Sequence, residues 1–213
     1  MDSPVWVYML GLAGMAIYGV RIVVQWYLSE KSHQVESPGI YWIMSSIGAI
    51  ILYIYGWLRK DLSIIFGESL SYYIYMWNIS VMGLYKKVPH SVIVIQALFP
   101  VLILILIFKD FPTFVDNFLR NEAVPPRLLA FGMLGQFTYE IRSVYQLVYS
   151  YRKKASILPL GHWIFVVAGS LMIILYGIIR HDWVLVIGQF AIVFSIRNIM
   201  IWFSAHKKDK KEE

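Results

Sequence analysis

The sequence has no cysteine and few charges, and each shortage excludes a class of protein. The absence of cysteine among the 213 residues excludes a disulfide framework, a thiolate nucleophile and a thiolate metal site. Only 15% of the residues are charged, whereas a soluble domain carries about 25%. The hydrophobic share is 59% and the mean hydropathy is +0.62, which excludes a soluble globular domain and a disordered chain. We therefore expect the chain to lie in a lipid bilayer.

Motifs for catalysis, metals, cofactors and nucleic acid are also missing. The sequence contains no nucleophile elbow, phosphate-binding loop or dinucleotide fingerprint. The five histidines, at positions 33, 90, 162, 181 and 206, show no metal-ligand spacing. The net charge is +6, but no basic-aromatic module for nucleic acid accompanies it. We expect a protein that is not an enzyme and that uses neither a cofactor nor a nucleic-acid partner.

Seven apolar stretches are long enough to cross a membrane, because a spanning helix needs about 20 mostly apolar residues. These stretches cover residues 5–28, 39–58, 62–85, 91–108, 128–149, 160–179 and 183–205. The one long connection, residues 109–127, mixes phenylalanine with charges and is expected to lie at the membrane interface. The predicted fold class is an all-α, polytopic membrane protein with seven transmembrane helices.

The positive charges favour one orientation of these helices. With the N-terminus outside, the cytoplasmic connections and tail carry ten lysines and arginines, against six in the outer connections. Cytoplasmic loops of membrane proteins carry the excess of positive charge. The count therefore predicts a multi-pass protein with its N-terminus outside and its C-terminus in the cytoplasm. No cleavable signal peptide is expected, because the chain begins Met-Asp-Ser-Pro, without a positive region.

An internal repeat relates the two halves of the chain at a constant offset of 121 residues. The offset pairs Gly11 with Gly132, Tyr18 with Tyr139, Arg21 with Arg142, Gln25 with Gln146, Trp42 with Trp163 and Gly67 with Gly188. Each repeat holds three predicted helices, and the single span between them makes the repeats parallel. The predicted domains are 5–87, a linker helix and interfacial segment at 88–126, 127–205 and a basic tail at 206–213. Parallel repeats occur in transporters, which bind substrate at the repeat interface.

The motifs of the repeat resemble a known membrane domain. Arg21-x3-Gln25-Trp26-x2-Ser29-Glu30, followed by Pro38-x2-Tyr41-Trp42-x2-Ser45, is similar to the N-terminal domain found on some lipid-A-disaccharide synthases. That family's repeat closes with an Arg-Lys-Asp turn, a Gly-Gln pair and an Arg-Asn pair. Here the turn is matched at residues 59–61 and 180–182, and the two pairs at residues 188–189 and 197–198. The first repeat departs from the pairs at Gly67-Glu68 and Met76-Trp77.

The resemblance implies a protein of the bacterial inner membrane that functions in lipopolysaccharide or lipid-linked sugar metabolism. It does not bring glycosyltransferase activity to this chain, because we expect no nucleotide-sugar-binding domain here. The arrangement of three, one and three helices also resembles the SWEET and PQ-loop proteins. That second likeness is one of topology only, since the Pro-Gln dipeptide of the PQ-loop family is absent.

A polar stripe on the first helix of each repeat is the main candidate site. Gly14, Tyr18, Arg21 and Gln25 are spaced by 4, 3 and 4 residues and share one helical face. The second repeat carries the same stripe as Gly135, Tyr139, Arg142 and Gln146. Guanidinium groups hold phosphate bidentately, so two of them from parallel repeats are expected to converge on a phosphate or diphosphate. The alternative is that both arginines snorkel to the cytoplasmic headgroups, and the sequence leaves both open.

Two further matched pairs allow a functional and a structural interpretation. Glu68 and Gln189 occupy equivalent positions and are either ligand contacts or, for Glu68, a protonatable group. The interpretation favoured for Glu68 is a water-facing carboxylate at a helix N-terminus, where the dipole stabilises it. Trp42 and Trp163 either stack on a sugar ring or pack in the core, and packing is favoured.

Three polar residues of the second repeat complete the candidate site. Arg197 and Asn198 interrupt an apolar run. Glu140 lies two residues before Arg142 and points to a different helical face, so we expect it to pair with Arg197 or to line a cavity. The predicted ligand-binding residues are Arg21, Gln25, Trp42, Glu68, Glu140, Arg142, Gln146, Trp163, Gln189, Arg197 and Asn198.

Three functions fit this sequence. The leading hypothesis is a transporter or flippase-like protein for a phosphorylated lipid carrier that bears a sugar. The second is a non-catalytic membrane subunit that docks a glycosyltransferase. The third is a carrier of free sugar of the SWEET kind, which the two cationic side chains disfavour. The expected partners are membrane lipid, a phosphorylated lipid-linked sugar and, under the second hypothesis, a glycosyltransferase.

Overall fold

The computed structural model describes residues 4–59, 62–109, 126–179 and 183–212, and these residues form helices and short connections without a strand. The first repeat comprises α1 (Val5–Ser32), α2 (Gly39–Arg59), α3 (Leu62–Val81) and the 3-10 turn η1 (Leu84–Lys87). The linker helix is α4 (His90–Lys109). The second repeat comprises α6 (Pro126–Lys153), α7 (Leu160–Ile179), α8 (Trp183–Gly188) and α9 (Ala191–Glu212). The predicted all-α fold is confirmed.

Four segments of this structure are long and apolar enough to cross a membrane: Val5–Ser32, Gly39–Leu58, Leu160–Ile179 and Val186–Ala205. A shorter apolar stretch, His90–Ile105, lies in α4. These segments identify a membrane protein. Most of the predicted interfacial segment, residues 110–125, and most of the two predicted turns, residues 60–61 and 180–182, lie outside the described residues.

The first and fifth predicted helices run beyond their predicted ends, to Ser32 and Lys153, and the third and seventh are shortened or divided. The third helix ends at Val81, because the chain turns at Gly83, whose φ of 70° suits glycine and disfavours residues with a Cβ. The seventh is divided into α8 and α9. The backbone N–H groups of Gln189 and Phe190 bond to carbonyls three residues earlier, at 3.2 and 3.1 Å, which interrupts the α-helical ladder.

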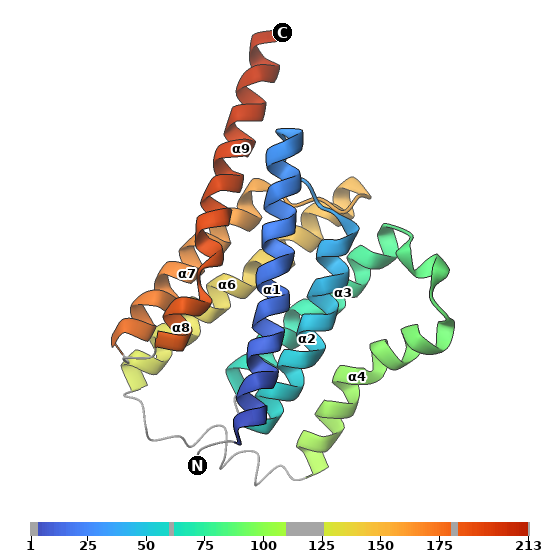
Figure 1. Cartoon of the computed structure of the whole chain (residues 1–213), viewed down its shortest axis with the longest axis vertical. Helices are drawn as coiled ribbons and strands as arrows, with labels where there is room; N and C mark the ends of the chain where they lie inside the picture. Colours follow the sequence, from blue (N-terminus) through green and yellow to red (C-terminus); the bar gives the residue numbers. More distant parts are fainter. Residues whose placement is uncertain (1–3, 60–61, 110–125, 180–182, 213) are drawn as a thin grey trace.

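The third helix of each repeat contacts both repeats: α3 packs against α2 and α6, and α9 packs against α7 and α1. Helix α1 packs against α2 of its own repeat and α9 of the other, and α6 packs against α7 of its own repeat and α3 of the other. In Figure 1, α1 and α6 run in the same direction, and the N- and C-termini lie at opposite ends of the long axis. The first helices of the two repeats are therefore parallel, as predicted, and the third helices join the repeats into one bundle.

The sequence repeat is also a repeat of close contacts between helices. A Cβ added at Gly11 would lie 2.7 Å from the ring of Tyr55, and one added at Gly132 would lie 2.6 Å from the ring of Tyr176. The first and second helices of each repeat thus approach each other at matching positions. Without a side chain at these glycines, a tyrosine ring can pack directly on the opposite helix.

Candidate functional site

Arg21 is buried in the bundle without an anionic partner among the described residues. Its side chain is 5% exposed, and its guanidinium lies 3.7 Å from the centre of the Tyr18 ring, one helical turn earlier on α1. The rings of Tyr41 and Tyr75 lie further away, at 5.1 and 5.5 Å. The Nη1 atom donates a hydrogen bond to Ser45 of α2, whereas the buried Nε atom has no partner. The site holds the cation by ring faces and a hydroxyl.

Arg142 occupies the matching position on α6 and differs in having a carboxylate partner. It is 4% exposed, and its guanidinium lies 3.8 Å from the centre of the Tyr139 ring. Its Nη1 atom lies 3.4 Å from Oε1 of Glu140, which forms an ion pair. The expectation that Glu140 is not the partner of this arginine was wrong, because the long side chain of Arg142 folds back along the helix. Both arginines lie inside the bundle, so the snorkelling alternative was wrong as well.

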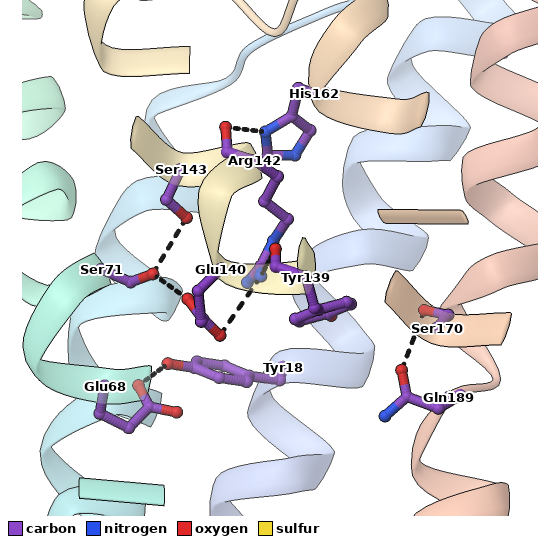
Figure 2. Close-up of polar contacts among 10 residues, drawn as sticks. All are labelled: Tyr18, Glu68, Ser71, Tyr139, Glu140, Arg142, Ser143, His162, Ser170 and Gln189. Atoms are coloured by element: carbon purple, nitrogen blue, oxygen red, sulfur yellow. Dashed lines mark hydrogen bonds and ion pairs between the residues drawn. The ribbon is translucent and has the colours of Figure 1, made fainter. Parts of the chain in front are cut away.

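Two carboxylates lie beside these arginines. The hydroxyl of Tyr18 donates to Oε2 of Glu68 on α3. Oε2 of Glu140 accepts a hydrogen bond of 2.7 Å from Ser71. Figure 2 shows Glu68 and Glu140 on either side of the Tyr18 hydroxyl. We call Tyr18, Arg21, Glu68, Glu140 and Arg142 the central polar cluster.

The favoured interpretation of Glu68 as a water-facing helix cap was wrong. Its carboxylate is held by Tyr18 of the neighbouring helix. The preceding Gly67 is buried, and a Cβ added there would lie 3.4 Å from Oε1 of Glu140. The backbone of α3 therefore approaches α6 closely at this point, and the half-buried Glu68 turns toward α1.

Glutamine and asparagine join the repeats at two equivalent points. Gln25 Nε2 donates to Asn198 Oδ1 and Asn198 Nδ2 donates to Gln25 Oε1, both at 3.0 Å. Gln146 Nε2 donates to Asn78 Oδ1 at 2.9 Å, and Asn78 Nδ2 returns a bond of 3.2 Å to Gln146 Oε1. All four side chains are fully buried. We call these two contacts the amide pairs; each links the first helix of one repeat to the third helix of the other.

The same glutamines hold the connection between the first and second helices. Gln25 Nε2 also donates to Ser29 Oγ at 2.9 Å and to the carbonyl of Glu36 at 3.1 Å. Gln146 repeats both contacts with Ser150, at 2.9 Å, and with the carbonyl of Ile157, at 3.1 Å. The amide groups are thus occupied by protein contacts in this conformation, and their predicted role toward a ligand stays a prediction.

Asn78 is a residue that the constant offset missed. An offset of 121 aligns Asn198 with Trp77, because the second repeat has one residue fewer between Gly188 and Asn198 than the first has between Gly67 and Asn78. A one-residue gap would have matched Trp77-Asn78 with Arg197-Asn198. The available signal was a second asparagine in an apolar helix near the expected position.

The structure places Arg197 and Gln189 away from the central polar cluster. Arg197 Nε donates to Oε2 of Glu30 at 2.9 Å, and both side chains are exposed. The suggested pairing of Arg197 with Glu140 was therefore wrong. Gln189 accepts a hydrogen bond of 2.9 Å from Ser170 of α7, on the far side of Tyr139 from the cluster in Figure 2.

The matched tryptophans are in the core. Trp42 and Trp163 are 2% and 0% exposed. Trp42 Nε1 donates to Ser37 Oγ at 3.0 Å, whereas Trp163 Nε1 has no hydrogen-bond partner among the described residues. Packing accounts for both rings in this conformation, and stacking on a sugar stays a prediction.

No group of three or more metal-ligating side chains occurs in the described part of the chain. An open hollow of about 330 Å³ lies at the end of α1, where Leu28, Lys31, Ser32 and Glu36 line it. These residues do not belong to the central polar cluster. Arg21, Glu140 and Arg142 of that cluster are buried in this conformation.

Comparison with known proteins identifies the family. The model of the Lipid A Biosynthesis N-terminal domain matches residues 10–80 and 131–210, one region in each repeat. Lipid-A-disaccharide synthase of Chlamydia caviae is 25% identical over 95% of this chain and 34% of its own length. The synthase of Chlamydia abortus is 26% identical over 97% of this chain and also 34% of its own length.

The chain thus spans about a third of the length of these curated relatives. The synthase of Chlamydia muridarum is 30% identical over a shorter region, 36% of this chain. No solved structure matches the chain significantly. Because the two regions that match the family model together cover most of the sequence, the chain belongs to the Lipid A Biosynthesis N-terminal domain family.

Proposed function

We propose that this protein of lipid A biosynthesis binds the phosphorylated headgroup of a lipid-linked sugar between its two repeats. We further propose that it moves this lipid across the bacterial inner membrane, with its N-terminus outside and its C-terminus in the cytoplasm. The observation that carries the proposal is the buried guanidinium of Arg21, whose Nε atom has no hydrogen-bond partner in the described part of the chain.

A buried cation without an ion pair destabilises the folded protein, so its presence in the bundle calls for an explanation. Charged side chains within membrane-spanning helices are rare and mark substrate or ion pathways by default. Within the described ranges, the contacts of the Arg21 guanidinium are neutral, namely three tyrosine rings and the hydroxyl of Ser45. A guanidinium with a spare N–H and no ion pair suits a phosphate oxygen, which accepts charge-assisted hydrogen bonds.

The position of Arg21 fits a transport cycle between parallel repeats. Its helix, α1, belongs to the first repeat and contacts both α2 and the third helix, α9, of the second repeat. Because the Nε atom is out of reach of solvent here, the headgroup enters when the helices around Arg21 separate. The present conformation is then an occluded one, and rocking of one repeat against the other opens the site.

The test uses the full chain in nanodiscs and a synthetic short-chain polyprenyl phosphoglucose as the probe. Arg21→Ala is expected to weaken binding at least tenfold, because it removes the only contact with the phosphate charge that the proposal assigns. Arg127→Ala, a matched change at an exposed arginine of α6, is expected to bind like the wild type. Equal binding by both variants would contradict the proposed site.

The movement of the lipid is tested separately in liposomes. A fluorescent derivative of the same probe should become accessible to a membrane-impermeant quencher faster in the presence of the protein. Arg21→Ala should abolish that acceleration, whereas Arg127→Ala should retain it. Normal movement in Arg21→Ala would dismiss the site, and binding without movement would limit the function to lipid binding.

A second function is favoured by one observation, the lengths of the relatives. The proteins named lipid-A-disaccharide synthase are about three times as long as this chain. This suggests a non-catalytic membrane subunit that docks a glycosyltransferase or presents lipid to it. Co-purification with a transferase, together with an absence of lipid movement by the isolated chain, would select this function over transport.

A further inference from the structure

The charges of the central polar cluster are unequally paired. Arg142 and Glu140 form a direct ion pair, and Glu140 is held further by Ser71. Arg21 and Glu68 form no ion pair among the described residues; the guanidinium of Arg21 lies 3.7 Å from the centre of the Tyr18 ring, and the Tyr18 hydroxyl donates to the Glu68 carboxylate. One half of the cluster therefore has a direct ion pair, and the other half has a carboxylate held by a neutral hydroxyl.

Several charged and titratable groups act on Glu68 from the helices packed around it. They are Tyr18 and Arg21 on α1, Tyr53 on α2, and Glu140 and Arg142 on α6. With both glutamates ionised, the two positive and two negative charges of the cluster balance. Any anion that enters beside Arg21 would leave an excess negative charge in the bundle interior, where low dielectric makes an uncompensated charge expensive.

We propose that a phosphate group bound at Arg21 is accompanied by one proton taken up by Glu68. This inference rests on the proposed function and adds the residue that balances the charge of the ligand. In the step, the carboxylate of Glu68 accepts a proton from water and becomes a neutral carboxylic acid. The arriving phosphate replaces Glu68 as the anion that balances Arg21, and the cluster stays neutral.

The second repeat supports this division of roles. Its position equivalent to Glu68 holds Gln189, a neutral amide that accepts a hydrogen bond from Ser170. The arginine of that repeat, Arg142, already has Glu140 as a permanent counter-ion. An amide thus occurs where the arginine is paired, and a titratable acid occurs where the arginine is free. The carboxylate of Glu68 is then required for charge balance rather than for packing.

The experiment measures proton uptake during binding of polyprenyl phosphoglucose to the full chain in nanodiscs. This phosphodiester is chosen because its own charge does not change near neutral pH. Calorimetry in two buffers of different ionisation enthalpy should give about one proton taken up per ligand at a pH where free Glu68 is ionised. Because protons are taken up on binding, affinity should fall as pH rises, by up to about tenfold per pH unit. Inorganic phosphate and unphosphorylated polyprenol, as separate arms, distinguish a lipid headgroup from free phosphate.

Glu68→Gln is the decisive variant, since the second repeat carries Gln at this position. It should bind the probe with the low-pH affinity of the wild type, take up almost no proton and show a flat pH profile. Glu30→Gln, the same change at an exposed carboxylate of α1, should retain the proton uptake. Unchanged uptake in Glu68→Gln would overturn the inference.

A measurement on the wild type keeps the inference testable if the variant does not fold. The infrared difference spectrum on binding should gain a protonated-carboxyl band, and a spectrum without this band would overturn the inference. Binding that depends on Arg21 but takes up no proton would reject the coupling and leave the proposed function standing. A wild type that does not bind the probe would reject both.

Discussion

The side-chain amides of Gln25 and Asn198 exchange two hydrogen bonds of 3.0 Å across the junction of the two repeats. Gln146 and Asn78 make the equivalent exchange with the order of the repeats reversed. Because the partners belong to different repeats, these contacts can form only when each third helix lies beside the first helix of the other repeat. The amide pairs therefore specify how the third helices join the two repeats, as well as stabilising that junction.

Replacing Asn198 with leucine is expected to lower the free energy of unfolding by about 1 kcal/mol. The change leaves the buried amide of Gln25 without its partner, and interhelical hydrogen bonds in membranes contribute up to about 1.7 kcal/mol. Unfolding in mixed micelles measures the loss. Ser204→Ala, at an exposed position of the same helix, should have no measurable effect. If Gln25→Leu and Asn198→Leu lower stability additively, the two residues are not coupled.

Two matched glycines should differ in their tolerance of alanine. A Cβ at Gly169 would lie 2.5 Å from the backbone nitrogen of Tyr139, which cannot move without shifting α6. A Cβ at Gly48 would lie 2.5 Å from the ring of Tyr18, which can rotate. We expect Gly169→Ala to cost about 3 kcal/mol of unfolding free energy and Gly48→Ala clearly less.

The control for both variants is Gly188→Ala. A Cβ there meets only Met15, at an ordinary distance of 3.7 Å. Thermal unfolding should rank the three variants as Gly169, Gly48 and Gly188, from the most to the least destabilising. A greater loss for Gly48→Ala than for Gly169→Ala would contradict the packing of α7 on α6.

The sequence predicted features that depend on periodicity and on the repeat. Apolar stretches located the helices, and the offset of 121 residues anticipated that the environments of Arg21 and Arg142 would match. Both guanidinium groups are in fact buried, and each lies over the ring of the tyrosine one helical turn earlier in its own helix. The spacing of residues on a helix sets which of them share a face, and that information is local.

Features that depend on side-chain reach or on the third helices escaped prediction. The pairing of Arg142 with Glu140 needs a long side chain that folds back along the helix, which spacing does not reveal. The pairing of Arg197 with Glu30 needs α9 to lie beside α1, a contact between the third helix of one repeat and the first helix of the other. Neither contact has a signature in a single sequence, because each is decided by packing between distant segments.

The two core tryptophans offer a comparison of a paired with an unpaired donor. Trp42→Phe removes the hydrogen bond to Ser37, whereas Trp163→Phe removes an indole N–H that has no partner among the described residues. Both changes remove the same volume from a buried position. We expect Trp42→Phe to be the more destabilising by about 1 kcal/mol, the net value of a hydrogen bond. Equal losses in chemical unfolding would show that the bond to Ser37 contributes nothing.

Removing only one partner of the ion pair between Arg142 and Glu140 should lower the free energy of unfolding more than removing both. Arg142→Met leaves the carboxylate of Glu140 buried without its cation, and removing one partner of a buried pair costs about 3 to 5 kcal/mol. Combining Arg142→Met with Glu140→Gln removes both charges and should recover more than half of that loss.

Arg21→Met combined with Glu140→Gln is the matched control. Arg21 has no ion pair with Glu140 among the described residues, so these two losses should simply add. Equilibrium unfolding of the three single and two double variants, together with the wild type, gives both coupling energies. If Arg142 and Glu140 show no coupling, the distance of 3.4 Å between Nη1 and Oε1 carries no stabilising interaction, and the division of the cluster into a paired and an unpaired arginine fails.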